Sequence, residues 1–445
     1  MLLGGMQGME RVVQSDIHAP YISLVTGPPG SMKSSLCLTL LTNHLNRTGE
    51  FGLYCTVEET VDSLMRAASS LGLQLPMNLQ VTDFTELRRE NEDMDYALLG
   101  FPEEEDWIFY GPYSDKTLIR NKLIYDLSNQ IGRYASRSKF CELTINNEYK
   151  GVYVFMEKLK RDKNRIAIKK LENSDLDSIN ISGGYIIKID KSDDDNGEQV
   201  YNDFNAFKSN YQPNYGTYQS IWFNYEYPKP KDIQNEQKIY IQNYFHNFEK
   251  ALSGTNFKDS LSGYRKYIDV ESFIDFFILN ELSNNLDGYR LSTFLHKNRN
   301  EKLKIGPIWD FNLSFGNGNY CNGEKYDTWT YKFNEKCSDD FWLIPFWWEK
   351  LLKDEYFVNK LKERWNELRK KELSDENIFQ MIQNYISILK NESGAVYRNY
   401  SKWNVIGKYL WPNNYVGNSY ESEIDYLIKW ITKRNNWLDK SINEL

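Results

Sequence analysis

Two aspartates, Asp287 and Asp310, have the residue type and the spacing that phosphoryl transfer requires. Asp287 follows an apolar helical pattern and lies in an Asn/Gly-rich loop, and Asp310 opens a second Gly/Asn-rich loop after a hairpin pattern. Phosphoryl transfer uses one carboxylate to orient the attacking hydroxyl and another to hold a metal ion on the phosphates. We therefore predict that Asp287 orients the hydroxyl and that Asp310 is a metal ligand.

The elements around these aspartates are predicted from apolar periodicity. A helix over residues 269–285 is capped at Asp269 and buries the apolar residues Phe273, Phe276, Phe277 and Leu282. The runs LSTFLHK and KLKIGPIW alternate around NRNE and predict a β-hairpin. Helix, Asp loop, hairpin and Asp-Phe loop follow in the order of a protein-kinase catalytic core, with a similar separation of the two aspartates.

One position departs from that kinase order. Ser292 stands where kinases place a metal-binding Asn, five residues after the first Asp. Asn312, two residues after Asp310, supplies a side-chain oxygen near the second aspartate. We predict that Asn312 replaces the missing ligand.

A phosphate-binding pattern, GPPGSMKSS, lies near the start of the chain. A buried-strand run precedes it and a helical run follows, and backbone N–H groups at such a helix start bind phosphate. Gly27 and Gly30 provide the turn, Lys33 the charge on the phosphates, and Ser34 a hydroxyl for magnesium. Met32 stands where the motif has its second glycine.

Strand and helix patterns continue this segment, with strands over 52–59 and 79–84 and a helix over 61–72. With LLGGM at its start and YCTVEETVDSL, the segment resembles the KaiC/RecA-like ATPases over about residues 1–96. The resemblance implies that Glu58 and Glu59 activate water. The later strands of that family have no counterpart, so we expect a partial α/β P-loop segment, in which nucleotide binding is open and ATP hydrolysis is not expected.

Composition changes near residue 97. All 12 Trp lie at or beyond Trp107, and Lys33 is the single lysine of the first 96 residues. The break indicates two segments of separate origin, residues 1–96 and 97–445, either by natural fusion or by an error in assembling the gene.

The second segment predicts a strand-rich part over 97–265, with its linking region, and a mainly helical part over 266–445. Ser114 or Asp115 is predicted to cap a helix that ends at Gly132. Strands are predicted over 139–145, 151–159 and 183–190. We expect an α+β chain with an atypical, two-lobed, protein-kinase-like fold, preceded by the partial P-loop segment.

Residues 97–445 resemble the spore-coat CotH kinase family, an atypical kinase-fold group. The matching phrases are DWIFYGPYSDKTLIRN, GVYVFMEKLKRDKNRI, GGYIIKID, YIDVESFIDFFILNELSNNLDGYRLSTF, GPIWDFNLSFGN and PFWWEKLL. The resemblance implies ATP- and Mg²⁺- or Mn²⁺-dependent phosphorylation of Ser/Thr on coat or surface proteins. It assigns catalysis to Asp287, the metal to Asp310 and Asn312, and the nucleotide pocket to Lys158, Glu157 and Arg120.

Bulk properties exclude some classes of protein. The formal charge is −8, which disfavours sequence-independent binding of nucleic acid. No apolar run is long enough to span a membrane, and the start lacks the pattern of a signal peptide, so a cytoplasmic protein is expected as written. Relatives of the kinase part are often exported or belong to the spore coat. In an exported protein Cys321 and Cys337 could pair; as cytosolic thiols they would stay free.

Three functions stay open from the sequence. The first is a CotH-type kinase that acts on a protein substrate. The second is a non-catalytic coat or surface assembly module with a kinase-like fold, and the third is a KaiC-like nucleotide-binding protein. Local alternatives also remain, because Asp287-Gly288 is a common turn pair and Glu157-Lys158 could be an ordinary ion pair.

Overall fold

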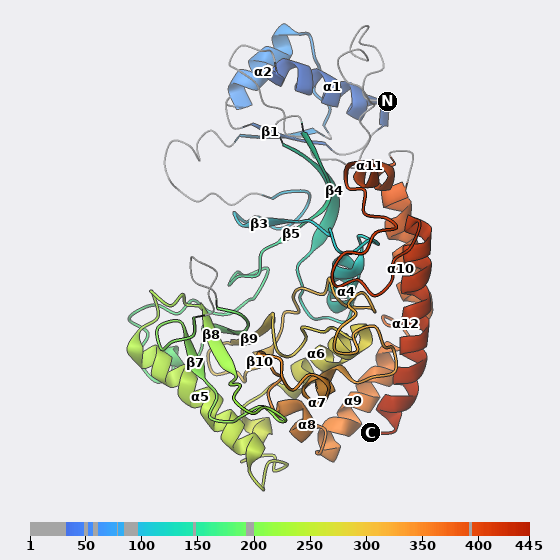
Figure 1. Cartoon of the computed structure of the whole chain (residues 1–445). Coiled ribbons are helices and arrows are strands. Elements are labelled where there is room, and N and C mark those ends of the chain that lie inside the picture. Colours follow the sequence, from blue (N-terminus) through green and yellow to red (C-terminus); the bar gives the residue numbers. More distant parts are fainter. Residues whose placement is uncertain are drawn as a thin grey trace. The chain divides into compact units, whose positions relative to one another are not determined.

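The structure is a computed structural model. It describes residues 33–48, 52–56, 61–77, 79–83, 97–145, 148–192, 200–390 and 394–445. The described chain mixes helices with three β-sheets, as the expected α+β class requires (Figure 1). It divides into two compact units, the first over 1–111, 139–156 and 386–404, and the second over 112–138, 157–385 and 405–445.

The first unit contains two small sheets. Strands β1 (Gly52–Thr56) and β2 (Leu79–Asp83) are parallel, and the helices before them are α1 (Lys33–Thr48) and α2 (Val61–Ser70). Parallel strands joined through a helix are what the α/β patterns of this segment predict. A three-stranded sheet has the order β3-β5-β4, with bounds Trp107–Tyr110, Glu148–Glu157 and Ser138–Ile145.

Helix α11 (Ala395–Lys402) secures the hairpin of this second sheet. The Val152 N–H donates to the Asn399 side chain at 2.9 Å, and Trp403 Nε1 donates to the Lys150 carbonyl at 2.6 Å. Arg398 Nε bonds to Glu142 at 2.9 Å. The strands predicted over 139–145 and 151–159 are therefore confirmed, and a helix far along the chain holds them.

The second unit is organised on a five-stranded sheet with the order β10-β9-β6-β8-β7. Strand β6 (Tyr185–Ile189) pairs antiparallel with both β9 (Thr293–Lys297) and β8 (Trp222–Tyr227). The outer strands are β7 (Ala206–Lys208) and β10 (Lys304–Ile305), and β10 forms the expected hairpin with β9. Strands from before and after residue 265, which the expected division separates, thus share one sheet.

Helix α5 (Asn235–Ser253) covers one face of this sheet (Figure 1). Its Phe245 ring lies 5.4 Å from Phe207 and 4.8 Å from Phe223, centroid to centroid. Trp347 stacks on Phe223 from helix α8 (Trp347–Leu351) and is fully buried. Trp347 therefore packs in the core between the sheet and the helices.

Helix α6 (Val270–Ser283) is the centre of the remaining helices. Its cap is Asp269, whose carboxylate accepts from the Ser272 N–H at 2.8 Å, as predicted. All but the first two residues of α6 are buried. The other helices and the 3₁₀ turns of this unit are α4 (Arg120–Gln130), α7 (Phe333–Lys336), α9 (Glu355–Leu368), α10 (Asp375–Lys390, which continues into the first unit), α12 (Tyr420–Asn443), η2 (Asn180–Ser182), η3 (Tyr264–Lys266) and η4 (Thr330–Lys332).

Helix α4 begins later than the expected cap at Ser114 or Asp115. Leu118 has a left-handed backbone with φ 65°, which no helix interior allows, so the helix starts at Arg120. Asp115 acts on the preceding turn instead, where its carboxylate accepts from the N–H groups of Thr117 at 3.0 Å and of Arg120 at 2.8 Å.

A disulfide joins Cys321 and Cys337 in the second unit, and Cys37 and Cys141 are free. The pairing left open from the sequence is therefore formed in the structure. No helix among the described residues is both long and apolar enough to cross a membrane.

Candidate functional site

Asp287 lies in the turn that follows α6. The helix ends at Asn284, whose backbone is left-handed with φ 45°. The Asn284 side chain donates to the carbonyl of Gly323 at 3.0 Å, which ties this turn to the loop beyond Asp310. Gly288 is required next, because a Cβ there would lie 2.3 Å from Asn280 Oδ1. The local sequence thus fixes where the aspartate stands.

One carboxylate oxygen of Asp287 is bound and the other is open. Arg290 Nη2 donates to Oδ1 at 2.9 Å, and the Asp287 side chain is 18 % exposed. Within the described chain, Oδ2 accepts no hydrogen bond. Burial raises the pKa of Asp287, while the Arg290 guanidinium opposes that rise.

Asp310 is positioned by helix α4. Its N–H donates to the Tyr125 hydroxyl at 2.9 Å, and the next N–H, of Phe311, donates to Asn121 Oδ1 at 2.6 Å. Its backbone is left-handed with φ 58°, a conformation that is uncommon for a residue with a Cβ. Two side chains of one buried helix therefore hold the turn that presents Asp310.

The charge of Asp287 acts on Asp310. Burial, together with the charges of Asp287 and Asp190, raises the pKa of Asp310 to about 6, against the N–H of Asn312. A carboxylate whose charge acts on another in this way shares a site with it. The structure therefore brings together Asp287 and Asp310, which the sequence places on different loops.

The donor atoms around Asp310 suit a hard divalent cation. Carboxylate and amide oxygens are the ligands that Mg²⁺ prefers, and Mn²⁺ accepts the same set. Asn312 follows two residues after Asp310, and its side chain bonds to no other residue in the part of the chain described. Burial is the main cause of the raised pKa of Asp310, and the charges of Asp287 and Asp190, which add to it, are a further reason for a cation to bind here.

Sequence reasoning missed the contribution of β6. The register places Ile189 opposite Thr293, so Asp190 follows directly beside the loop that carries Asp287. Asp190 raises, and Lys191 lowers, the pKa of both Asp287 and Asp310. The signal available was an aspartate at the end of the predicted strand GGYIIKID, but only strand pairing shows what it faces.

The three residues predicted for the nucleotide pocket differ in their burial and in their interaction partners. Glu157 is fully buried and binds Arg137 through Nη2 at 2.6 Å and Nε at 2.9 Å. Lys158 is exposed at the end of β5. Arg120 is 1 % exposed and pairs with Asp115, although its neighbour Asn121 contacts the Asp310 loop. The three residues thus take part in separate interactions, and their contact with a nucleotide stays a prediction.

Most of the P-loop prediction concerns positions outside the described residues. Gly27, Gly30, Glu58 and Glu59 are among these. Lys33 and Ser34 open α1, so the helix that should follow the loop is present.

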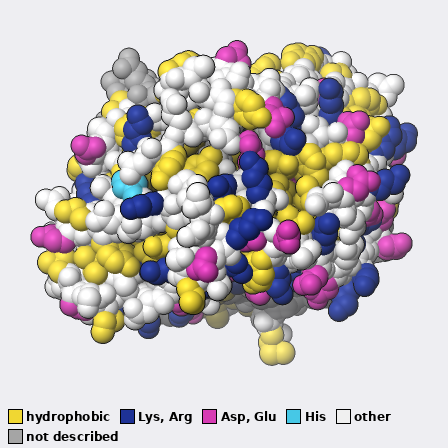
Figure 2. Space-filling model, turned by 90° about the horizontal axis from the view of Figure 1, so that it is seen from below, with side chains coloured by type: hydrophobic (Ala, Val, Ile, Leu, Met, Phe, Trp, Pro, Cys, Tyr) yellow, Lys and Arg dark blue, Asp and Glu magenta, His cyan; other side chains and the backbone are white. Residues whose placement is uncertain are grey.

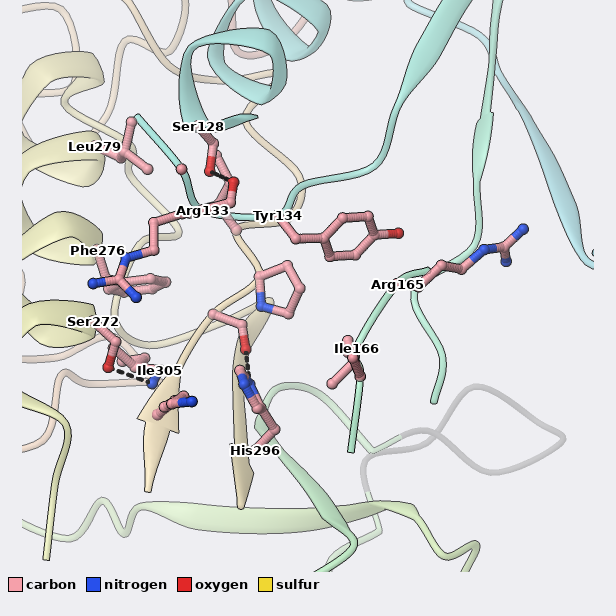
Figure 3. A pocket seen from close by; sticks show the side chains of 16 residues that line it. Ser128, Arg133, Tyr134, Arg165, Ile166, Ser272, Phe276, Leu279, His296 and Ile305 are labelled. Atoms are coloured by element: carbon pink, nitrogen blue, oxygen red, sulfur yellow. Dashed lines mark hydrogen bonds between the residues drawn. The ribbon is translucent and has the colours of Figure 1, made fainter. Parts of the chain in front are cut away.

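A cavity of about 150 Å³ lies in the second unit, lined by neither Asp287 nor Asp310 (Figure 3). Its walls come from the end of α4, from α6 and from the β9–β10 hairpin, and include Tyr134, Phe276 and Pro307. His296 hydrogen-bonds through Nδ1 to the Gly306 carbonyl at 3.0 Å, and burial lowers the pKa of His296 to about 4. The cavity is distinct from the candidate site.

The surface visible in Figure 2 carries basic and acidic side chains close together, with apolar patches between them. No single sign of charge dominates this face.

Comparison with protein families agrees with both resemblances seen in the sequence. The family described as CotH kinase protein matches residues 76–438, which include the aspartate loops, the hairpin and most of the helices. The chain therefore belongs to the CotH kinase family. A second family, the KaiC ATPase, matches residues 3–90 and overlaps the first match over 76–90. A search of curated proteins finds no match to this chain.

Proposed function

We propose that the chain is an ATP-dependent protein kinase of the CotH type, which transfers the γ-phosphoryl group to Ser or Thr of coat or cell-surface proteins. The observation that carries this proposal is the state of Asp287. One oxygen of its carboxylate is fixed by Arg290, the other is open, and the charge of Asp287 acts on the second aspartate, Asp310.

In the proposed reaction, Asp287 Oδ2 accepts a hydrogen bond from the acceptor hydroxyl and orients it toward the γ-phosphorus. The hydroxyl oxygen forms the new P–O bond, the bond to the bridging oxygen of ATP breaks, and ADP leaves. Asp287 receives the proton that the hydroxyl loses. Its raised pKa, caused by burial, makes it a better base than an exposed aspartate.

Asp310 and Asn312 would hold a magnesium or manganese ion. Such an ion neutralises the charge that develops on the phosphate oxygens. The chain's own contribution is to present two oxygen ligands on a turn that Tyr125 and Asn121 hold in place.

For the nucleotide we retain Lys158, Glu157 and Arg120 as candidates, with different roles. Lys158 is exposed and could contact phosphate or ribose directly. Glu157 and Arg120 are themselves buried and are held in ion pairs with Arg137 and Asp115, so they would act by fixing the ends of β5 and α4.

The test is phosphoryl transfer from labelled ATP with Mn²⁺ or Mg²⁺, either to the chain itself or to a Ser-rich coat-type protein. We expect transfer by the wild type and none by Asp287→Asn or Asp310→Ala. Wild-type activity in Asp310→Ala would overturn the proposal. Calorimetry with ATP and Mn²⁺ distinguishes the non-catalytic assembly module, which binds no ATP in a metal-dependent way.

The KaiC match favours a second candidate function, nucleotide binding by the N-terminal segment. Its expected signature is ATP binding that Lys33→Ala abolishes and Asp310→Ala leaves unchanged. The reverse pattern assigns the nucleotide to the CotH part alone.

A further inference from the structure

Arg290 joins the catalytic aspartate to a second carboxylate that the sequence places far away. We propose that Arg290 and Asp340 are positioning residues for phosphoryl transfer, which fix one oxygen of Asp287 so that the other is presented to the acceptor hydroxyl. The inference rests on the proposed function and adds two residues and a disulfide to it.

The guanidinium of Arg290 is fully engaged. Nη2 donates to Asp287 Oδ1 at 2.9 Å, Nη1 donates to Asp340 Oδ1 at 3.1 Å, and Nε donates to the Leu286 carbonyl at 2.9 Å. The side chain is 3 % exposed, and its central carbon lies 4.1 Å from the centroid of the Phe333 ring. Because all three of its nitrogens donate hydrogen bonds, the planar guanidinium of Arg290 has a single orientation. A lysine ammonium could not make the same set of bonds.

Asp340 is itself fixed. Its Oδ1 also accepts from the Trp342 N–H at 2.9 Å, and its carbonyl accepts from Gln219 Nε2 at 2.9 Å. Gln219 is 2 % exposed and also binds the Ser338 carbonyl at 3.0 Å. The far end of the bridge is thus anchored to a buried side chain, so Arg290 cannot follow Asp287 if that aspartate turns.

The disulfide connects the two segments that approach Asp287. Cys321 follows Tyr320, whose pKa burial raises and the Arg290 guanidinium lowers, and Cys337 follows the last residue of α7, three residues before Asp340. The covalent link therefore keeps the segments of Tyr320 and Asp340 close to the same guanidinium. Loss of the link would release the segment that anchors this guanidinium.

The charges around Asp287 indicate what the second carboxylate, Asp340, contributes. Arg290 alone would hold Asp287 ionised and make it a weaker base, and Lys191 acts in the same direction. Asp340 and Asp190 act in the opposite direction. The Asp287–Arg290–Asp340 arrangement thus fixes the orientation of the Asp287 carboxylate. Because Asp340 partly offsets the charge of Arg290, Asp287 loses less of its basicity than it would beside an arginine alone.

Another arginine in this unit makes a comparable bridge away from the site. Arg369 binds Asp375 at 3.0 Å and Asp439 at 3.0 Å, and its side chain is 15 % exposed. It is a matched control, because its replacement also removes a guanidinium between two carboxylates.

The experiment compares Arg290→Lys, Asp340→Asn and Arg369→Lys by steady-state kinetics with labelled ATP, and by thermal unfolding. We expect Arg290→Lys to lower kcat at least about tenfold, with KM for ATP within about twofold, because orientation of the acceptor is lost and ATP contacts are not. Asp340→Asn should lower kcat less, and Arg369→Lys should lower only the unfolding temperature. Guanidinium ion should restore part of the kcat of Arg290→Ala, whereas equal NaCl should not.

A second arm tests the disulfide. Reduction should lower kcat severalfold and reversibly, and the Cys321→Ser/Cys337→Ser variant should have the low value and be insensitive to reductant. Unchanged kcat in Arg290→Lys, or a loss equal to that of Arg369→Lys, overturns the inference alone. An inactive wild type overturns the proposed function and this inference with it.

Discussion

Glu281 of α6 and Arg434 of α12 form an ion pair that is fully removed from solvent, with Nη2 and Oε2 3.2 Å apart. Glu281 also accepts from the N–H groups of Thr330 at 2.8 Å and Tyr331 at 2.9 Å. Burial raises its pKa, and the guanidinium of Arg434 opposes that rise. Since α6 ends two residues later and leads into the Asp287 turn, this pair links the last helix of the chain to the base of the candidate site.

Replacing Arg434 by Met should destabilise the second unit strongly. The change leaves Glu281 as a buried carboxylate without its cation, and removal of one partner of a buried pair costs about 3–5 kcal/mol. Denaturant unfolding, followed by the fluorescence of the buried tryptophans, measures the loss.

The control is Glu281→Gln combined with Arg434→Met. With both charges gone, the amide can still accept from the Thr330 N–H, so the double variant should be more stable than Arg434→Met. Equal instability of the two variants contradicts the view that an unpaired charge is the cause.

Stability should fall as pH rises from about 5 to 8 because of Glu249. This carboxyl is fully buried against Ser209 and Trp347, and burial raises its pKa to about 7. Between its unfolded and folded pKa values the folded state binds more protons, so stability is highest below the unfolded value and is lost through the folded one. The total change is on the order of 3 kcal/mol.

Glu249→Gln tests this directly. The amide keeps an acceptor for the Ser209 hydroxyl and the Trp347 Nε1, and it does not titrate. Its free energy of unfolding should change less between pH 5 and 8 than that of the wild type. Parallel pH curves for the two proteins contradict the assignment.

Local sequence signals predicted the elements that carry the site. Asp269 caps α6 as expected, and the alternation around NRNE gives β9 and β10. These features depend on a few neighbouring residues, so they can be read from the sequence. The two aspartates could be located with them, because each lies in the loop that follows such an element.

The partners of those aspartates could not be read in the same way. Asp190 lies beside the site because Ile189 pairs with Thr293 in the sheet. Asp340 is connected to the site by its ion pair with Arg290 and lies close to the Cys321–Cys337 disulfide. Arg120 has the right charge for a phosphate, but Asp115 five residues earlier turns back to bind it. The position of Asp190 depends on the pairing of distant strands, and that of Arg120 on the left-handed backbone of Leu118. Neither feature can be predicted from the neighbouring residues in the sequence.

Gly288→Ala should damage the site through sterics alone. The added Cβ would lie 2.3 Å from Asn280 Oδ1 and 3.0 Å from the Asn285 carbonyl oxygen, both held by buried backbone and side chains. We expect a loss of about 1–3 kcal/mol in stability, with a lower kcat from displacement of Asp287. Gly254→Ala is the control, because its Cβ would meet nothing nearer than 3.3 Å. Unchanged stability and kcat in Gly288→Ala contradict the close approach.

Removal of the Asp310 charge should weaken metal binding before any nucleotide is present. Mn²⁺ titrated into the whole chain by calorimetry should bind at least about tenfold more weakly to Asp310→Asn than to the wild type, since even partners outside the ligand set cost about 10–100-fold when lost. Asn312→Ala should lose less, because it contributes a neutral oxygen. Glu301→Gln is the control, a carboxylate at the turn of the same hairpin that pairs with Lys304 at 2.9 Å. Equal Mn²⁺ affinity of Asp310→Asn and Glu301→Gln would show that the acidic pair does not hold the ion.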